Sequence, residues 1–274
     1  MIKTTLGDVL KRFRIEKNVE AQNICKGLCP VSMMSYFESG ERVPDTVLFL
    51  CLMERMGVSS EDFAVIVKDE EYRYHIWKKE VLEAIENATW ETLGMLLESK
   101  ISKKIFCNEK LERQFFCYTR AIYVGIQEKY KEATELLKIA IEQTIFDMFK
   151  ITESNTVFRG IELHMLMLYL YYGIHGNVLD VHTGRVLFDK LEQYICSERL
   201  ELNEQAKCYP KLVCIGIHLF RDSMDISKQM ALCEKAVTLL RKNKTFCDIT
   251  GLLELYIALL RETNNKELGF YEKQ

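Results

Sequence analysis

Apolar residues recur every three or four positions along most of this chain, which is the spacing of one face of an α-helix. Near the start, Leu6, Val9, Leu10 and Phe13 follow this spacing, and the opposite face is basic. The same reasoning predicts four further short helices in the first 70 residues, over 21–26, 30–38, 47–56 and from Ser59 or Ser60 onward. The sequence therefore predicts an N-terminal domain of five helices.

The proposed second and third helices are separated by a glycine-containing turn, which is the arrangement of a helix-turn-helix. Gly27 suits the left-handed position after a helix, and Pro30 is tolerated in a first helical turn. Gly40 and Pro44 close the third helix, and Asp45 or the threonine after it can cap the fourth. The turn chemistry thus supports the helix boundaries that the apolar spacing predicts.

The rest of the chain reads as one helix after another. The charged stretch 68–74 contains no Gly or Pro and predicts the start of a linking helix. The predicted helices cover 74–87, 90–99, 107–127, 131–148, 156–174, 180–196, 203–221, 226–242, 245–263 and a short piece at 265–271. We expect Pro210 to kink the 203–221 helix or to start a new one. The expected domains are residues 1–68 and 69–274.

The composition agrees with an all-α fold. Only 3 prolines and 13 glycines occur among 274 residues, too few for the turns of a many-stranded sandwich or barrel. The net charge of −3 gives no overall positive field that would attract nucleic acid. No apolar run reaches the ~18 residues of a membrane span, and the N-terminus lacks the apolar region of a signal peptide. We therefore expect a cytoplasmic protein.

The ten cysteines are scattered, form no CxxC pair and lie mostly within apolar helical patterns. We interpret them as structural thiols in a reducing cytosol. Cys25 and Cys29 can share one helix face, but no third ligand follows at zinc spacing. His164, His175 and His182 are expected at a corner between helices, with a ligand set as the less favoured reading. No catalytic motif is present, so we expect neither enzymatic activity nor a metal or cofactor.

One segment of the second domain points to helical repeats. Residues 130–141 resemble the second helix of a tetratricopeptide repeat (TPR), with small Ala133 and Ala140 allowing close helix contact around Leu137. Residues 230–237 give a weaker copy. The expected architecture is a TPR-like α-solenoid, whose stacked helix pairs offer a concave binding surface. A generic helical bundle is the alternative.

A family resemblance rests on residues 27–44. The glycine–aliphatic–cysteine turn at 27–29 and the run Glu38, Gly40, Arg42 and Pro44 resemble the XRE (lambda-repressor-like) helix-turn-helix domain, in its Rgg/PlcR-type variant. The resemblance implies that the third helix lies in the DNA major groove. Val31, Met34 and Phe37 are then expected to face inward.

The same resemblance nominates the residues that contact DNA. The outward positions expected to reach bases are Ser32, Met33, Ser35 and Tyr36. The expected phosphate contacts are Arg42, together with Arg12 and Arg14 in the first helix. Residues 1–60 hold eight Lys or Arg against seven Asp or Glu, a weak positive balance for a DNA-binding module. In the alternative, Arg42 pairs with Glu38 and the domain does not bind DNA.

A helix-turn-helix module followed by TPR-like repeats resembles the RRNPP group of peptide-sensing (quorum-sensing) transcription regulators. That resemblance implies a homodimer on a palindromic operator and a short signalling peptide on the concave surface. The candidate peptide-binding residues are Tyr118, Tyr169, His218 and Arg221, whereas Phe115 and Ile122 are expected in the core. The alternative is a protein-interaction adaptor whose N-terminal domain has lost DNA binding.

Overall fold

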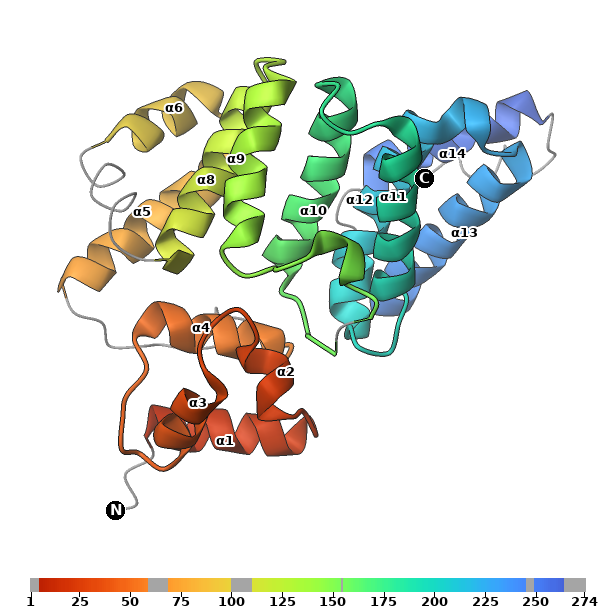
Figure 1. Ribbon diagram of the computed structural model, residues 1–274. Helices are drawn as coiled ribbons and strands as arrows, with labels where there is room; N and C mark the ends of the chain where they lie inside the picture. The colour runs from red at the N-terminus through yellow and green to blue at the C-terminus, as the bar shows by residue number, and fades with distance from the viewer. Residues whose placement is uncertain (1–4, 59–68, 100–109, 154, 245–248, 264–274) are drawn as a thin grey trace. The chain divides into compact units, whose positions relative to one another are not determined.

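A computed structural model describes residues 5–58, 69–99, 110–153, 155–244 and 249–263 of the chain. Within these ranges every regular element is a helix, which confirms the predicted all-α class (Figure 1). None of the helices in these ranges combines the length and the apolarity that a bilayer crossing requires. The short helix expected from Ser59 or Ser60 and the piece at 265–271 lie outside the described residues.

The four described N-terminal helices are α1 (Leu6–Glu16), α2 (Ala21–Cys25), α3 (Val31–Glu38) and α4 (Thr46–Arg55). Thr5 and Asp8 form a reciprocal capping box at the start of α1. The Asp45 carboxylate accepts a hydrogen bond from the Leu48 amide at 2.8 Å, which confirms the predicted cap of α4. Gly27 has φ +77°, the left-handed conformation predicted for it.

A shared apolar core holds these four helices together. Its buried members come from all four helices and the residue that follows α4: Leu10, Ile24, Cys25, Met34, Phe37, Phe49, Leu52, Met53 and Met56. Met34 and Phe37 face inward on α3, as the spacing predicts. Val31 does not, because it is the first residue of α3 and 46% of its surface is exposed.

The remaining helices follow the predicted order with small shifts at their ends. They are α5 (Asp69–Glu86), α6 (Trp90–Glu98), α8 (Lys110–Gly125), α9 (Tyr130–Glu142), α10 (Gly160–His175), α11 (Val181–Ile195), α12 (Leu202–Phe220), α13 (Ile226–Asn243) and α14 (Ile249–Glu262). The helix predicted over 131–148 ends six residues early, and a short 3-10 turn, η2 (Met148–Lys150), follows it. A second 3-10 turn, η3 (Arg221–Ser223), extends the end of α12.

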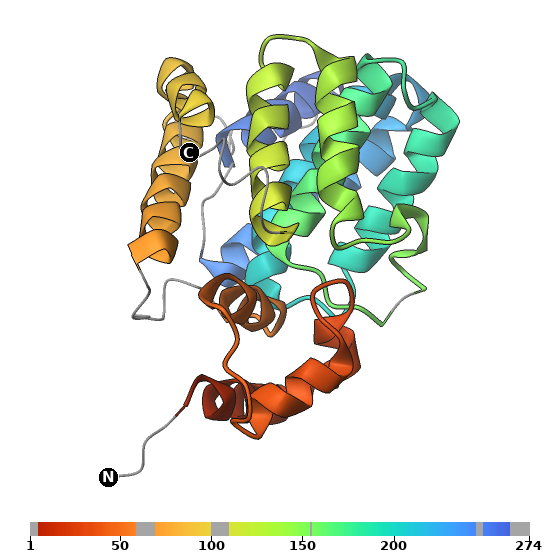
Figure 2. The ribbon, with the colours of Figure 1, turned by 60° about the vertical axis from the view of Figure 1, so that its left-hand side comes forward.

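The contacts divide the chain into two compact units, Met1–Val178 and Leu179–Gln274. In the first unit α5 packs on α6, α8 on α9 and α9 on α10, and Figure 2 shows α8 and α9 side by side. In the second unit α12 packs against α11, α13 and α14. The expected boundary at residue 68 falls inside the first unit. The division into domains 1–68 and 69–274 stays a prediction.

Pro210 neither ends nor restarts its helix. The helix α12 runs from Leu202 to Phe220 with Pro210 inside it, so the new helix weighed from the sequence does not begin there, whereas a kink at Pro210 stays a prediction. Proline removes one backbone hydrogen bond, and that cost is local. Pro210 and its neighbours Tyr209 and Leu212 are buried against the packed helices of the second unit. The burial of this face stabilises the helix across the proline.

Candidate nucleic-acid interface and peptide site

The third helix presents a small polar surface to solvent. Ser32, Ser35 and Tyr36 are exposed, and Met33 is half-buried. Arg42 follows the helix and returns to it: its guanidinium lies 5.4 Å from the centre of the Tyr36 ring, and its Nη1 lies 3.4 Å from the Met33 sulfur. Three of the predicted DNA-binding side chains are therefore in mutual contact. We call Ser32, Met33, Ser35, Tyr36 and Arg42 the recognition face.

The partner of Glu38 is Arg14 of α1, and the Arg42–Glu38 pair considered from the sequence does not form. Arg14 Nε and Nη2 donate to the two Glu38 carboxylate oxygens at 2.6 and 2.8 Å. The hydrogen bond to Glu38 raises the pKa of the Arg14 guanidinium, and the Arg14 side chain is only 23% exposed. The pair ties α1 to the end of α3. Arg14 therefore has a structural partner, whereas Arg12 is exposed and its Nε lies 3.9 Å from a Glu16 carboxylate oxygen.

The four candidate peptide-binding residues fall in two places. Tyr118 on α8 and Tyr169 on α10 belong to the first unit, and His218 and Arg221 belong to the second. The Tyr118 hydroxyl hydrogen-bonds the Nδ1 atom of His164 at 2.7 Å, and burial raises the pKa of Tyr118. Tyr169 is 9% exposed, so little of it meets solvent.

In the second unit, His218 is exposed near the end of α12. Arg221 forms an ion pair with Glu262 of α14. Phe115 and Ile122 are buried, as expected for core residues. The assignment of all four side chains to a peptide site stays a prediction.

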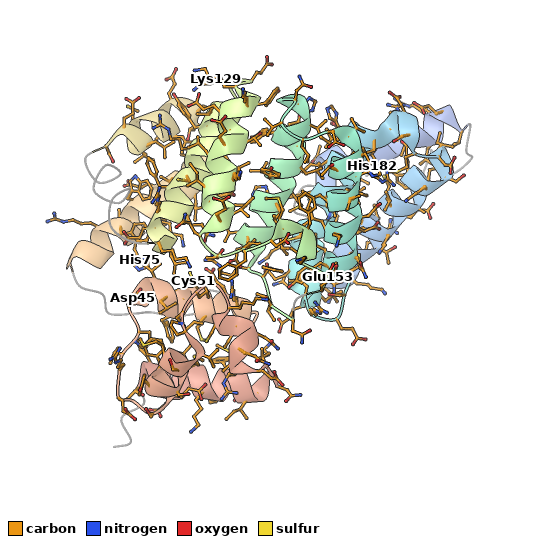
Figure 3. All side chains as sticks on the ribbon, viewed as in Figure 1. Asp45, Cys51, His75, Lys129, Glu153 and His182 are labelled. Atoms are coloured by element: carbon orange, nitrogen blue, oxygen red, sulfur yellow. The ribbon has the colours of Figure 1, made fainter. Side chains whose placement is uncertain are left out.

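The three clustered histidines have separate surroundings. His164 contacts Tyr118, and the His175 ring lies 4.5 Å from that of Tyr171. His182 lies at the start of α11, in the other unit (Figure 3). No group of three or more His, Cys, Asp or Glu side chains suited to a metal ion occurs within the ranges that the structure describes.

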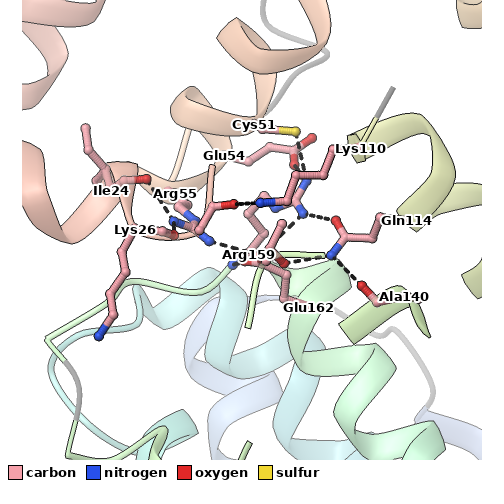
Figure 4. A network of polar contacts seen from close by, with 12 residues as sticks. Ile24, Lys26, Cys51, Glu54, Arg55, Lys110, Gln114, Ala140, Arg159 and Glu162 are labelled. Carbon is pink, nitrogen blue, oxygen red and sulfur yellow. Dashed lines mark hydrogen bonds and ion pairs between the residues drawn. The ribbon is translucent and has the colours of Figure 1, made fainter. Parts of the chain in front are cut away.

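A buried polar network that the sequence did not reveal joins α4 to α8 and α10 (Figure 4). Arg55, the last residue of α4, donates from Nη1 to the carbonyl oxygens of Ile24 at 2.8 Å and Lys26 at 2.5 Å. Its Nη2 reaches a carboxylate oxygen of Glu162 on α10 at 3.0 Å. Neither side chain of this ion pair has any exposed surface. Arg55 thus links the end of α2 to the first turn of α10.

Arg159 extends the network. Its Nη1 donates to the Cys51 sulfur at 2.8 Å, and its Nη2 hydrogen-bonds the Gln114 side chain and lies 3.4 Å from Glu162. Cys51 lies in the middle of α4 (Figure 3). Burial alone would raise the pKa of Glu162, but attraction to Arg159 and Arg55 outweighs it and lowers the pKa to about 2. The carboxylate is therefore ionised at neutral pH.

The turn of the helix-turn-helix rests against the same helices. Lys110 Nζ of α8 donates to the Gly27 carbonyl oxygen at 2.7 Å, and the Val157 amide donates to the Asn23 carbonyl oxygen at 3.3 Å. A Cβ atom on Gly27 would collide with the Thr144 carbonyl oxygen. Glycine is thus required at residue 27 for its φ angle and for this close approach. We call these contacts, with the Arg55 and Arg159 network, the docking face.

One signal in the sequence could have located the docking face. Arg55 follows the apolar run 47–53 and Glu54, and Glu162 directly precedes the mostly apolar run 163–172. A charged residue beside long apolar stretches is buried only when it is paired. The pattern could therefore have nominated each residue as buried, but not its partner 107 residues away.

No protein-family model matches the sequence, and no curated protein sequence matches it. Several solved structures align with the chain. Bacillus thuringiensis PlcR, solved in complex with the peptide PapR7 and DNA, aligns with a TM-score of 0.58 and 14% identity over 99% of this chain and 91% of PlcR.

Two others are ComR from S. thermophilus, in complex with DNA and its signalling peptide ComS, and the Streptococcus dysgalactiae SHP pheromone receptor Rgg2. ComR aligns with a TM-score of 0.46 and 16% identity over 97% of this chain and 90% of ComR. Rgg2 aligns with a TM-score of 0.36 and 14% identity over 95% of this chain and 99% of Rgg2. These two scores are too low to carry an argument. The chain therefore resembles PlcR in fold, as the resemblance of its helix-turn-helix motif to the Rgg/PlcR type predicted.

Proposed function

We propose that this protein is a sequence-specific DNA-binding transcription regulator controlled by a short signalling peptide. The observation that carries the proposal is the recognition face, an exposed polar helix surface with Arg42 beside it, on a fold that resembles PlcR. Exposed serines can hydrogen-bond to several bases, and an exposed tyrosine can contact a base edge or a thymine methyl group. Arg42 and Arg12 supply positive charge for phosphates. Arg14, held by Glu38, positions α1 against α3.

The proposal places control of the DNA-binding helices in α8 and α10. α8 carries Lys110, which holds the turn, and Tyr118, a candidate peptide contact. α10 carries Glu162, which pairs with Arg55, and Tyr169. A peptide that binds two arrangements of these helices with different affinity shifts the population between them. A change in the arrangement of α8 and α10 would alter the contacts of the turn at Gly27, because Lys110 and Glu162 of these helices hold it.

DNA binding is tested with duplex DNA from the region upstream of the protein's own gene, at several salt concentrations. We expect log K to fall as log[salt] rises, because phosphate contacts release counterions. Arg42→Ala should weaken binding to all sequences and reduce the salt slope by about 1, whereas Tyr36→Ala should relax specificity. Lys79→Ala, which removes an exposed positive charge from α5, is the control and should change neither.

The alternative function is a protein-interaction adaptor with an N-terminal domain that does not bind DNA. Residues 1–60 carry eight basic against seven acidic side chains, and one of those cations, Arg14, is already paired with a carboxylate. A salt slope near zero, unchanged by Arg42→Ala, would favour the adaptor and overturn the proposed regulator.

Peptide control is tested by calorimetry with a synthetic peptide that matches the secreted product of a small open reading frame beside the gene. Tyr118→Phe removes the hydroxyl that bonds His164 and should lower peptide affinity several-fold if this pair contacts the peptide. Tyr123→Phe, on the same helix but facing Gly94 of α6, is the matched control. Equal effects of the two substitutions would argue against a peptide site at Tyr118. Dimerisation, which we also propose, is checked by light scattering with and without operator DNA.

A further inference from the structure

Two cysteines flank the turn of the helix-turn-helix. Cys25 is the last residue of α2, and the Cys29 amide donates to the Cys25 carbonyl oxygen at 3.0 Å. This hydrogen bond closes a tight turn in which Gly27 has φ +77°, so the backbones of the two cysteines are drawn together across five residues. Both thiols are free. The turn thus holds two free thiols close to each other, as a short disulfide loop requires.

The two thiols differ in burial and charge. Cys25 has no exposed surface, and its hydrogen bond with Cys29 together with burial raises its pKa. Cys29 is half-buried. The hydrogen bond with Cys25 lowers the pKa of Cys29, and the nearby positive charge of Arg55 adds to this effect. The thiolate is the reactive form of cysteine, so Cys29 has the character of an attacking group and Cys25 of its neighbouring thiol.

Arg55 connects the pair to the docking face. Its Nη1 binds the carbonyl oxygens of Ile24 and Lys26, the residues on either side of Cys25. Its Nε is buried and has no hydrogen-bond partner among the described residues. A buried cation with unused donor capacity beside Cys29 favours negative charge on that sulfur.

Five other cysteines among the described residues have a raised pKa, because burial outweighs any nearby cation. They are Cys51, Cys117, Cys196, Cys208 and Cys233. Among these, Cys196 on the end of α11 is half-buried like Cys29, so it has comparable access to small reagents. Cys196 therefore serves as an internal reference.

We propose that Cys25 and Cys29 are a peroxide-sensitive thiol pair that closes to an intrachain disulfide. The Cys29 thiolate attacks one oxygen of hydrogen peroxide and breaks the O–O bond. With one proton this gives a Cys29 sulfenic acid and water. The Cys25 thiol then displaces the hydroxyl group as a second water and forms the S–S bond. In total, two thiols lose two electrons and two protons to one peroxide, and a dithiol reductant reverses the change.

The modified turn is the one that docks on α8, α9 and α10. Gly27 lies between the two cysteines, has φ +77° and touches the Thr144 carbonyl oxygen. A new covalent bond across this five-residue segment changes the sulfur positions, and the close approach leaves little room for the backbone to follow. The disulfide would therefore act where the helix-turn-helix contacts the rest of its unit. The proposal does not depend on DNA binding.

The test treats the full-length protein with hydrogen peroxide, followed by a peptide map without reduction. We expect a linked pair of peptides containing Cys25 and Cys29, reversed by dithiothreitol. Sulfenic acid formation at Cys29 in Cys25→Ser, trapped with dimedone, should be at least tenfold faster than labelling at Cys196. Cys29→Ser should give no cross-link and no label at Cys25, and Cys196→Ser should behave like the wild type.

Two outcomes would overturn the proposal. One is the absence of a Cys25–Cys29 link in the wild type after peroxide, which needs no variant to interpret. The other is labelling of Cys196 as fast as Cys29 in Cys25→Ser, which would mean that access alone sets reactivity. Either result leaves the proposed DNA-binding function untouched, because that is measured by the salt dependence of operator binding under reducing conditions.

Discussion

Two arginines of the same helical domain, Arg42 and Arg55, illustrate two different uses of one side chain. Arg42 follows α3, is exposed and lies over the Tyr36 ring. Arg55 ends α4, is fully enclosed and binds two backbone carbonyl oxygens and Glu162. The exposed arginine is available to a phosphate. The buried one is committed to holding the turn against α10.

The energetic consequences of the two positions differ. An exposed cation contributes little to folding, about 0–1 kcal/mol even when paired. Removing one partner of a buried ion pair leaves an uncompensated charge in a medium of low dielectric, which costs about 3–5 kcal/mol. Substitutions in the recognition face should therefore cost little folding stability, whereas the docking face constrains the fold.

The largest effect is expected for Arg55→Ala. It leaves two carbonyl oxygens and one side of Glu162 without their buried donor, so the free energy of unfolding should fall by about 3–5 kcal/mol. Arg42→Ala should change it by less than about 0.5 kcal/mol. Urea unfolding followed by circular dichroism measures both. Similar losses for the two variants would mean that the faces do not differ as described.

The charge on Glu162 predicts a specific pH dependence. The folded pKa of about 2 lies below the ordinary value of 4.5, so the carboxylate stabilises the fold above about pH 4.5. This contribution, about 3 kcal/mol, is lost as pH falls from about 4.5 towards 2. The free energies of unfolding of the wild type and of Glu162→Gln should differ most at pH 7, and the difference should shrink below about pH 4.5 and vanish only as the pH approaches 2. A constant difference across this range would contradict an ionised Glu162.

Two glycines with the same backbone conformation allow the cost of backbone strain to be measured apart from the cost of disturbing the docked turn. Gly27 has φ +77° and Gly40 has φ +76°. A Cβ on Gly40 meets nothing within 4 Å, whereas one on Gly27 collides with the Thr144 carbonyl oxygen. Gly40→Ala should lower the free energy of unfolding by about 1–2 kcal/mol, because alanine is strained in the left-handed conformation. Gly27→Ala should cost about 1–3 kcal/mol more, the usual range for overpacking. Thermal unfolding of both variants checks this, and equal losses would show that the turn is not tightly docked.

The smallest effect on stability is expected for Arg12 and Arg14 of α1, which the sequence analysis both assigned to phosphate contacts. Arg14→Ala removes the bidentate, largely buried pair with Glu38 and should cost about 1–2 kcal/mol, typical of a hydrogen bond to a charged group. Arg12→Ala loses a single exposed contact and should cost less than about 0.5 kcal/mol. The order should reverse for operator binding. There Arg12→Ala should lower the slope of log K against log[salt], as expected for the loss of a phosphate contact.

The helices were predictable because their signals are local. The capping carboxylate of Asp45, the left-handed Gly27 and the inward positions Met34 and Phe37 follow from short-range rules that tertiary contacts did not override. At Pro210 the local rule allowed either a kink or the start of a new helix. No new helix starts there, because burial in the second unit stabilises α12 across the proline.

The recognition face was predictable as a set of residues, because its motif is contiguous from 27 to 44. The partners of its charged groups were not. From the sequence, the candidate partner of Glu38 was Arg42, four residues away. In the structure Glu38 pairs with Arg14, which is 24 residues away. Spacing along one helix is visible in the sequence, whereas the proximity of two helices is set by the core between them.

The sequence by itself determined the all-helical class, the helix-turn-helix and the exposed positions of α3. The tertiary structure alone decided which charges are buried and with whom. Arg55 and Glu162 are 107 positions apart, and only the packing of α4 against α8 and α10 brings them to 3.0 Å. The physical reason is that helix formation depends on neighbours within a few residues. The cost of burying a charge is offset by groups that only the completed fold assembles.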